Sequence, residues 1–126
     1  MGIGPGPQNR FAIQFVDGCF NQTGSGEDMG AYASLALEPT TNAVNLSYYD
    51  FNKADLRYAY KADSSNVWYT MSIDGNGTDV GGYTSLVVDN EGNRHISYYE
   101  VTNADLKYAY GPSGPNDISW QLYSVD

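Results

Sequence analysis

The sequence predicts an all-β protein of the β-propeller type, made of two four-stranded antiparallel blades with one extra strand in front of them. Three observations predict this class: a composition rich in strand and turn residues, a long internal repeat, and short aromatic segments divided by turn sequences. The chain of 126 residues has 14 Gly and 12 Tyr. Tyr favours the pleated, half-buried surface of a sheet, and Gly favours turns. No ten-residue segment shows the spacing of an amphipathic helix.

The internal repeat covers most of the chain. The segment "LSYYDFNKADLRYAY" at 46–60 returns as "ISYYEVTNADLKYAY" at 96–110. The similarity continues upstream, where "GAYASLALE" matches "GYTSLVVD" if Gly30 is paired with Gly82. A repeat of 20–50 residues is typical of solenoids, propellers and arrays.

Each repeat divides into four strand segments. The first, as in "YTSLVVD", carries little charge and suits a strand buried on both faces. The second and third, "RHISYYE" and "DLKYAY", are short and rich in Tyr, and the fourth opens with a large aromatic residue. Turn sequences such as "DNEGN" and "EVTNAD" separate them. The predicted strands are 31–38, 43–50, 55–61 and 66–74 in blade one (30–74), and 83–89, 93–100, 104–110 and 118–125 in blade two (82–126).

An extra strand is predicted at 10–17, because "RFAIQFVD" repeats the fourth strand of each blade. Residues 1–9 are rich in Gly and Pro and predict a flexible tail ahead of the two-blade module at 10–126. The corresponding positions of the three copies are Phe11, Trp68 and Trp120 near the start and Asp17, Asp74 and Asp126 at the end.

The motifs of the repeat also resemble a known family. The pattern Gly-x-Tyr-x-Ser-Leu, then Ile-Ser-Tyr-Tyr-Asp, then Asp-Leu-Lys-Tyr-Ala resembles blades of bacterial sialidase-like β-propeller proteins and covers residues 10–126. The resemblance implies that the first strand of each blade lines a central channel and that the fourth strand is outermost.

The sequence does not predict an enzyme. The resemblance implies that a true sialidase would gather three arginines around its substrate, whereas this chain has only Arg10, Arg57 and Arg94, and Arg57 matches Lys107 of the repeat. The Asp-box of the family, Ser-x-Asp-x-Gly-x-x-Trp, is missing. A glycoside hydrolase with two carboxylates is kept as a third hypothesis, after binding and scaffold roles.

Two blades cannot close a ring, because propellers have 4–8 blades. We expect a homo-oligomer in which chains join head to tail, with a trimer preferred and a dimer or a tetramer as alternatives. One of the end strands, 10–17 or 118–125, would then cross between chains. Alternatively, the chain is a piece of a longer propeller, or its two sheets form a sandwich that is completed by dimerisation.

The charge balance narrows the class of partner. Lys and Arg number 6 against 15 Asp and Glu, for a net charge of −9. Such acidity argues against nucleic acids and anionic membranes as partners. No apolar run approaches a membrane span, and the N-terminus lacks the pattern of a signal peptide, so the default expectation is a cytoplasmic protein. The lone Cys19 cannot form an internal disulfide.

The candidate ligand site lies where the turns after the second strand meet the connections into the first strand. Tyr rings offer an apolar face with a polar tip, which suits carbohydrates. The function predicted is therefore an oligomeric, lectin-like module, with a structural or protein-interaction scaffold as the alternative. Tyr48 and Tyr98 are expected to assist, and the turn side chains have a purely structural alternative as caps of their own turns. The predicted ligand-binding residues are Tyr32, Asp50, Asn52, Asp55, Tyr83, Glu100, Asn103 and Asp105.

One turn also resembles a cation loop. "DGNGTD" places the side-chain oxygens of Asp74, Asn76 and Asp79 in a Gly-rich turn, as Ca²⁺ prefers. It lacks the distal glutamate of a full calcium loop, so a plain turn is the alternative. No other cofactor is expected.

Overall fold

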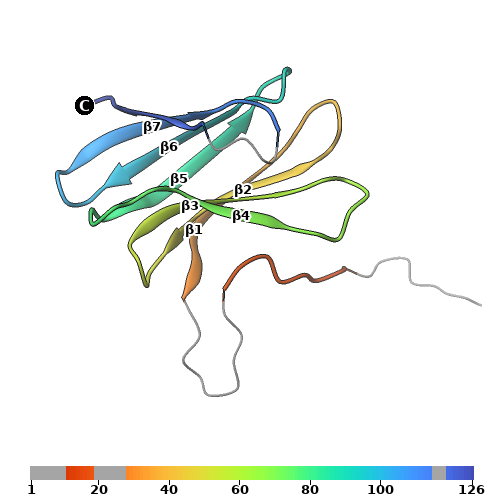
Figure 1. The fold of residues 1–126 in the computed structure, drawn as a ribbon, viewed down its shortest axis with the longest axis horizontal. Coiled ribbons are helices and arrows are strands. Elements are labelled where there is room, and N and C mark those ends of the chain that lie inside the picture. The colour runs from red at the N-terminus through yellow and green to blue at the C-terminus, as the bar shows by residue number, and fades with distance from the viewer. Residues whose placement is uncertain (1–10, 19–27, 115–118) are drawn as a thin grey trace, which may run out of the picture.

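The computed structural model describes residues 11–18, 28–114 and 119–126, and over these it consists of two stacked antiparallel sheets (Figure 1). No helix occurs among these residues. The first sheet contains β1 (Met29–Leu37), β2 (Val44–Asp50), β3 (Asp55–Lys61) and β4 (Tyr69–Asp74). The second sheet contains β5 (Val80–Val88), β6 (Arg94–Glu100), β7 (Asp105–Gly111) and β8 (Gln121–Ser124).

Each sheet is a meander in which strands adjacent in sequence are adjacent in space, in the orders β1-β2-β3-β4 and β5-β6-β7-β8. The prediction of an all-β chain with two four-stranded antiparallel sheets is confirmed. The strand β3 has the predicted bounds, whereas β4 and β8 begin later than predicted. Short turns join β1 to β2 and β2 to β3, as meanders require.

The extra strand predicted at 10–17 is wrong for the residues that the structure describes. Residues 11–17 are irregular. They lie across a face of the first sheet instead of along the edge of a strand, so they meet no row of backbone hydrogen-bonding groups to pair with (Figure 1). The tail predicted at 1–9 lies outside the described residues, as do Arg10 and Cys19.

The register of the repeat also needs a correction of one residue. Met29 pairs with Asp50 in the first sheet, and Val80 pairs with Glu100 in the second. The glycines that follow have φ of +101° at Gly30 and +110° at Gly81. Gly30 is therefore equivalent to Gly81, and its predicted pairing with Gly82 is wrong.

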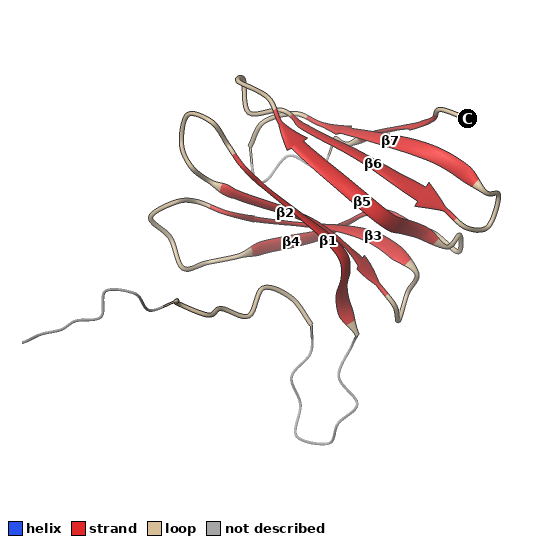
Figure 2. Cartoon of the chain, turned by 180° about the vertical axis from the view of Figure 1, so that it is seen from behind, coloured by secondary structure: helices blue, strands red, loops and turns tan. Residues whose placement is uncertain are grey.

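The sheets stack back to front. We call the face that carries Leu46, Tyr48 and Arg57 in the first sheet, and Ile96, Tyr98 and Lys107 in the second, the front face; the back face carries Leu56 and Tyr58, and Leu106 and Tyr108. The back face of the first sheet packs on the front face of the second. Contact runs mainly through β5, which lies against β1, β2 and β3 (Figure 2).

The core lies between the two sheets. Leu56 on the back face of the first sheet is 0% exposed and packs with Leu86 and Ile96 of the second. Polar contacts also tie the layers, among them the Ser47 hydroxyl donating to Thr84 Oγ1 at 2.8 Å and the Leu86 amide donating to Ser34 Oγ at 3.1 Å. One side of the interface is filled by aromatic rings around a buried cation, Arg94, between Tyr58 and Trp120.

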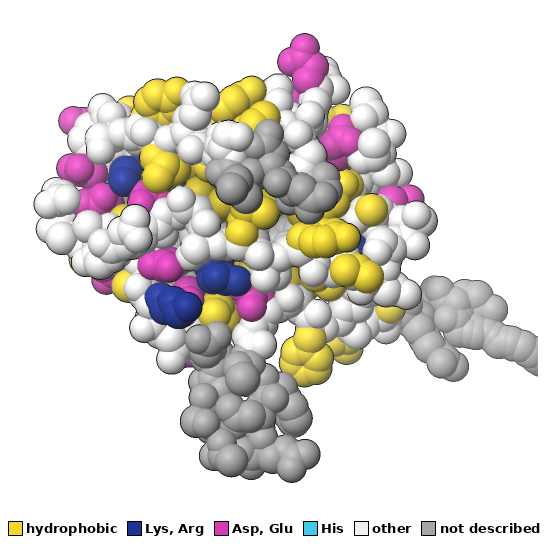
Figure 3. Space-filling model, in the orientation of Figure 1, with side chains coloured by type: hydrophobic (Ala, Val, Ile, Leu, Met, Phe, Trp, Pro, Cys, Tyr) yellow, Lys and Arg dark blue, Asp and Glu magenta, His cyan; other side chains and the backbone are white. Residues whose placement is uncertain are grey.

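The N-terminal segment 11–18 forms a third layer. Figures 1 and 2 show it on the side of the first sheet that faces away from the second sheet. On the surface seen in Figure 3, hydrophobic side chains form several patches among acidic and basic ones. The described residues contain no helix that is long and apolar enough to cross a membrane.

Candidate ligand-binding site

A cleft lined by tyrosines lies at one end of the stacked sheets, between the β4–β5 connection and the turns after β2 and β6. We call it the tyrosine cleft. Its volume is about 250 Å³, and its lining comes from Tyr32, Tyr49, Phe51, Asp79, Gly82, Tyr83, Tyr99 and Val101. Because pockets for whole drug-sized ligands span roughly 300–1,000 Å³, the tyrosine cleft suits one ring of a larger ligand.

The two central tyrosines of the cleft occupy equivalent and unusual backbone positions. Tyr32 has φ of +54° and Tyr83 has φ of +53°, a region that a bulky residue rarely adopts. Each lies at a register shift, between Ala31 and Ser34 in β1 and between Gly82 and Ser85 in β5. A bulge turns a side chain away from the alternation of its strand, here toward the strand ends. The same local device therefore points both rings into one cleft.

The rings form a continuous aromatic surface. The Tyr32 and Tyr83 centroids are 4.6 Å apart, and the Tyr83 and Tyr99 centroids are 6.4 Å apart. Tyr49 meets Tyr32 edge-on at 5.9 Å. Tyr83 remains 71% exposed, so much of its ring faces solvent and is available to a ligand.

The polar groups of the cleft are neutral hydroxyls beside one carboxylate. The Tyr49 hydroxyl donates to Asp79 Oδ1 at 2.6 Å. Burial and then this hydrogen bond raise the pKa of Tyr49 to about 12, and the neighbouring Tyr83 hydroxyl raises the pKa of Tyr32. Both hydroxyls therefore stay protonated at neutral pH and can donate and accept hydrogen bonds.

The predicted turn residues of the first sheet lie outside the lining of this cleft. Asp50 is buried, and its Oδ1 accepts from the amides of Asn52 at 2.8 Å and Lys53 at 3.1 Å, which is the capping role kept as the alternative. Asn52 Oδ1 accepts from the amide of Asp28. Asp55 accepts from the Ser72 hydroxyl at 2.7 Å.

The equivalent residues of the second sheet are arranged in a similar way. Glu100 is 4% exposed, accepts from the Asn103 amide group, and lies 3.4 Å from Lys107 Nζ. Asp105 pairs with Glu100 across the β6–β7 ladder. Of the eight predicted ligand-binding residues, the structure brings Tyr32 and Tyr83 together in the cleft.

The three residues of the predicted cation loop point to different partners. Asp74 Oδ2 accepts from the Tyr98 hydroxyl at 2.8 Å and from Lys107 Nζ at 2.7 Å, while Asp79 accepts from Tyr49. Asn76 lies in an exposed turn with φ of +57°. Within the described part of the chain, no group of three or more His, Cys, Asp or Glu side chains is placed to hold a metal ion.

The tyrosines predicted to assist in the cleft, Tyr48 and Tyr98, are the wrong members of their doublets. They are 3% and 1% exposed on the front faces, whereas the next residues, Tyr49 and Tyr99, line the cleft. Adjacent residues of a strand point to opposite faces, so the doublet offers both choices. The two tyrosines of each doublet differ in their partners. The first tyrosine donates a hydrogen bond to the aspartate that ends a fourth-strand sequence: Tyr48 to Asp17, and Tyr98 to Asp74.

Comparison with known proteins identifies no relative of this chain. No protein-family model, no curated protein and no solved structure matches the chain. Function is therefore inferred from the geometry of the chain itself.

Proposed function

We propose that this chain is a non-catalytic carbohydrate-binding module that acts through the tyrosine cleft and assembles head to tail into a propeller-type ring. The observation that carries the binding role is the pair of equivalent tyrosines, Tyr32 and Tyr83, held at positive φ in one exposed cleft. Strained backbone is retained mainly where the surrounding structure holds it for a purpose.

The chemistry of the cleft supports a sugar as the ligand. The exposed ring of Tyr83 offers an apolar platform for a sugar face, while the hydroxyls of Tyr32 and Tyr49 and the carboxylate of Asp79 offer hydrogen bonds at its rim. Among the described residues that line the cleft, Asp79 is the single carboxylate. A glycoside hydrolase uses a pair of carboxylates on either side of the scissile bond, so binding is favoured over hydrolysis.

Self-association is supported by the front face of the first sheet. Leu35 and Leu37 on this face are 61% and 50% exposed, whereas their equivalents in the second sheet, Leu86 and Val88, are 5% and 7% exposed. The second pair is covered by the back face of the first sheet. The first pair would be covered in the same way by the back face of another copy.

The back face of the second sheet shows the complementary difference. Leu106 is 48% exposed, but its equivalent in the first sheet, Leu56, is completely buried. Each chain thus has a front face that only the N-terminal segment covers in part, and an uncovered back face. Fully burying a leucine stabilises by about 1.5–3 kcal/mol, which favours repetition of the same joint between chains.

An interface between the back face of one chain and the front face of the next is heterologous. Such interfaces close into a ring when the rotation from one sheet to the next permits it. Three chains would give six blades, the preferred assembly, and two or four chains would give four or eight. A mass in solution near a small multiple of 13.8 kDa, measured by light scattering, is the expected result. A well-folded monomer at all concentrations would contradict the assembly.

The binding role is tested on a glycan array with the wild-type chain, Tyr83→Ala and the control Tyr69→Ala. Tyr69 is 46% exposed on β4, away from the cleft. We expect wild type and Tyr69→Ala to bind the same glycans and Tyr83→Ala to lose roughly tenfold or more in affinity, since an aromatic platform contributes of the order of 1–3 kcal/mol in stacked complexes. An array with no bound glycan would favour the scaffold alternative.

A further inference from the structure

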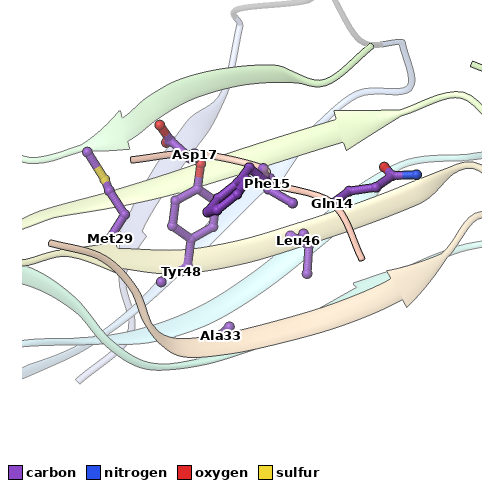
Figure 4. Close-up of a pocket in the computed structure, with 9 residues that line it drawn as sticks. Gln14, Phe15, Asp17, Met29, Ala33, Leu46 and Tyr48 are labelled. Atoms are coloured by element: carbon purple, nitrogen blue, oxygen red, sulfur yellow. The ribbon is translucent and has the colours of Figure 1, made fainter. Parts of the chain in front are cut away.

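The front face of the first sheet contains a site for a single carboxylate. The Tyr48 hydroxyl donates to Asp17 Oδ2 at 2.5 Å, and Arg57 Nε donates to the same oxygen at 2.8 Å. We call Tyr48 and Arg57 the carboxylate socket. Figure 4 shows Asp17 at the hydroxyl end of Tyr48.

The second sheet has the equivalent socket, and a neighbouring sheet fills it. Tyr98 and Lys107 replace Tyr48 and Arg57, and both donate to Asp74 Oδ2, at 2.8 and 2.7 Å. Asp74 is the last residue of β4, the outer strand of the first sheet. The interface between the two stacked sheets therefore includes an acidic residue at the end of the fourth strand of one sheet, Asp74, which is bound in the socket of the next sheet.

A third acid occupies the same position of the repeat. Asp126 follows β8, the fourth strand of the second sheet, as Asp74 ends β4. Its backbone carbonyl accepts from the Leu106 amide at 2.9 Å, which holds the end of the chain beside β7. Among the hydrogen bonds and ion pairs of the described residues, none involves the side-chain carboxylate of Asp126.

We infer that Asp126 of a second copy is the natural occupant of the Tyr48–Arg57 socket, and that Asp17 holds its place in the isolated chain. This inference rests on the proposed head-to-tail assembly and names its contact. When the back face of one chain covers the front face of the next, the repeat brings Asp126 to the socket as it brings Asp74 to Tyr98 and Lys107. The Tyr48 hydroxyl and Arg57 Nε each have one proton to donate, and both go to Asp17 Oδ2, so Asp126 can accept these two hydrogen bonds only after Asp17 leaves.

The N-terminal segment has the features of a displaceable occupant. Ahead of Asp17, Phe11 and Ile13 are 94% and 92% exposed, so the segment buries little apolar surface on the sheet. Gln14 accepts from Trp68 Nε1 at 3.0 Å, a contact at the exposed edge. Beside the socket, the segment and the strands β1 and β2 line an open hollow of about 220 Å³ (Figure 4). The segment therefore lacks the close packing on the first sheet that is found between the two sheets.

Displacement makes the N-terminal segment a competitor of assembly. A chain whose socket is occupied by its own Asp17 cannot bind a second copy there. The apparent affinity between chains is therefore the intrinsic affinity multiplied by the fraction of chains whose socket is free. Removing the Asp17 carboxylate should therefore strengthen association, while removing the Asp126 carboxylate should weaken it. These opposite signs separate a competitor from a contributor.

The test measures mass against concentration by light scattering or sedimentation, for the 126-residue wild type, Asp17→Ala, Asp126→Ala and the control Asp63→Ala, an exposed aspartate of the β3–β4 loop. We expect Asp17→Ala to lower the dissociation constant by about tenfold, Asp126→Ala to raise it by about tenfold or more, and Asp63→Ala to leave it unchanged. Arg57→Met should weaken association in both the wild-type and the Asp17→Ala background.

The outcomes distinguish this inference from the proposed function. Equal association of wild type and Asp126→Ala would overturn the socket assignment and leave the assembly standing. Weaker association of Asp17→Ala would show that Asp17 contributes to the joint, and would overturn its role as a competitor. A monomer in all variants would remove the assembly and the inference together. Glycan binding by the tyrosine cleft is measured separately and does not enter this comparison.

Discussion

The two sheets have nearly the same sequence but opposite environments. The front face of the second sheet and the back face of the first are buried against each other. The back face of the second sheet is open, and the front face of the first is covered only in part, by the N-terminal segment around Tyr48. Leu56 is completely buried and Leu106 is 48% exposed, although they occupy the same place in the repeat. Whether a repeated residue is buried or exposed therefore depends on which sheet carries it and on whether another sheet packs against that face, and not on the strand sequence alone.

The sequence differs between the sheets at the side of the interface where their environments differ. Arg94 is 1% exposed, and its equivalent in the first sheet is Val44. Gly111 replaces Lys61, and any Cβ at Gly111 would lie 2.7 Å from the Trp120 ring. Tyr58, Arg94 and Trp120 therefore fit together because this repeat has no side chain at 111. A joint between chains would use Val44 and Lys61 there, so that corner would differ.

The same substitution at Leu56 and Leu106 should have the most unequal consequences for stability, because the first residue is buried and the second is exposed. Leu56→Asp places an unpaired carboxylate in the core and should destabilise the chain by more than about 4 kcal/mol, or prevent folding. Leu106→Asp places the same charge on an open face, and should leave the fold intact while preventing association. Urea unfolding followed by tryptophan fluorescence gives the stability, and light scattering gives the mass. Equal destabilisation by both changes would contradict the asymmetry of the two faces.

Substitution of the equivalent glycines, Gly81 and Gly30, by alanine should change the free energy of unfolding by a smaller amount. Gly81 has φ of +110°, and a Cβ there would lie 2.8 Å from the Cα of Leu56. Gly30 has φ of +101°, but a Cβ would meet nothing within 4 Å. Gly81→Ala should therefore cost roughly 3 kcal/mol from strain and collision, and Gly30→Ala about 1 kcal/mol from strain alone.

The glycine pair is measured by urea unfolding at a concentration low enough to keep the chain monomeric. If chains associate as proposed, the cost of Gly30→Ala should rise at high concentration, because a second copy would then approach Gly30 as Leu56 approaches Gly81. A cost that is equal for the two glycines at low concentration would contradict the open state of the first front face.

The two four-stranded sheets were predictable from the repeat, because each copy contains the same four strand sequences. Turn sequences placed β2, β3, β6 and β7 to within a residue. The irregular state of residues 11–17 was not predictable, since their sequence repeats β4 and their state depends on whether a partner edge is present. A strand pattern reports what a segment can pair with, and the pairing itself requires a neighbour.

The site was predictable only in part. Tyr32 and Tyr83 were predictable as aromatic residues near the connections into β1 and β5, whereas the bulges that turn both rings into the cleft were not predicted. The turn acids were not distinguishable from caps by spacing, and Asp50 caps its own turn. Tyr49 and Tyr99 required knowledge of which face of each sheet packs inward, which depends on the stacking of whole sheets.

A small, pH-dependent effect on stability is expected at His95, which occupies the position of Asn45 in the repeat. Asn45 is buried and accepts from the Tyr58 hydroxyl, whereas His95 lies on the open back face, 2.9 Å from Asp89 Oδ2 and 2.8 Å from the Tyr108 hydroxyl. The hydrogen bond from His95 lowers the pKa of Asp89 to about 2.

Because the pKa of Asp89 is lowered in the folded state, its ionised carboxylate stabilises the fold above about pH 4. This contribution is lost as the pH falls toward 2. Asp89→Asn should therefore lower the midpoint of urea unfolding slightly at pH 6, and the difference from wild type should vanish near pH 2. A difference that persists unchanged at pH 2 would show that the shape of the turn, and not the charge of Asp89, is responsible.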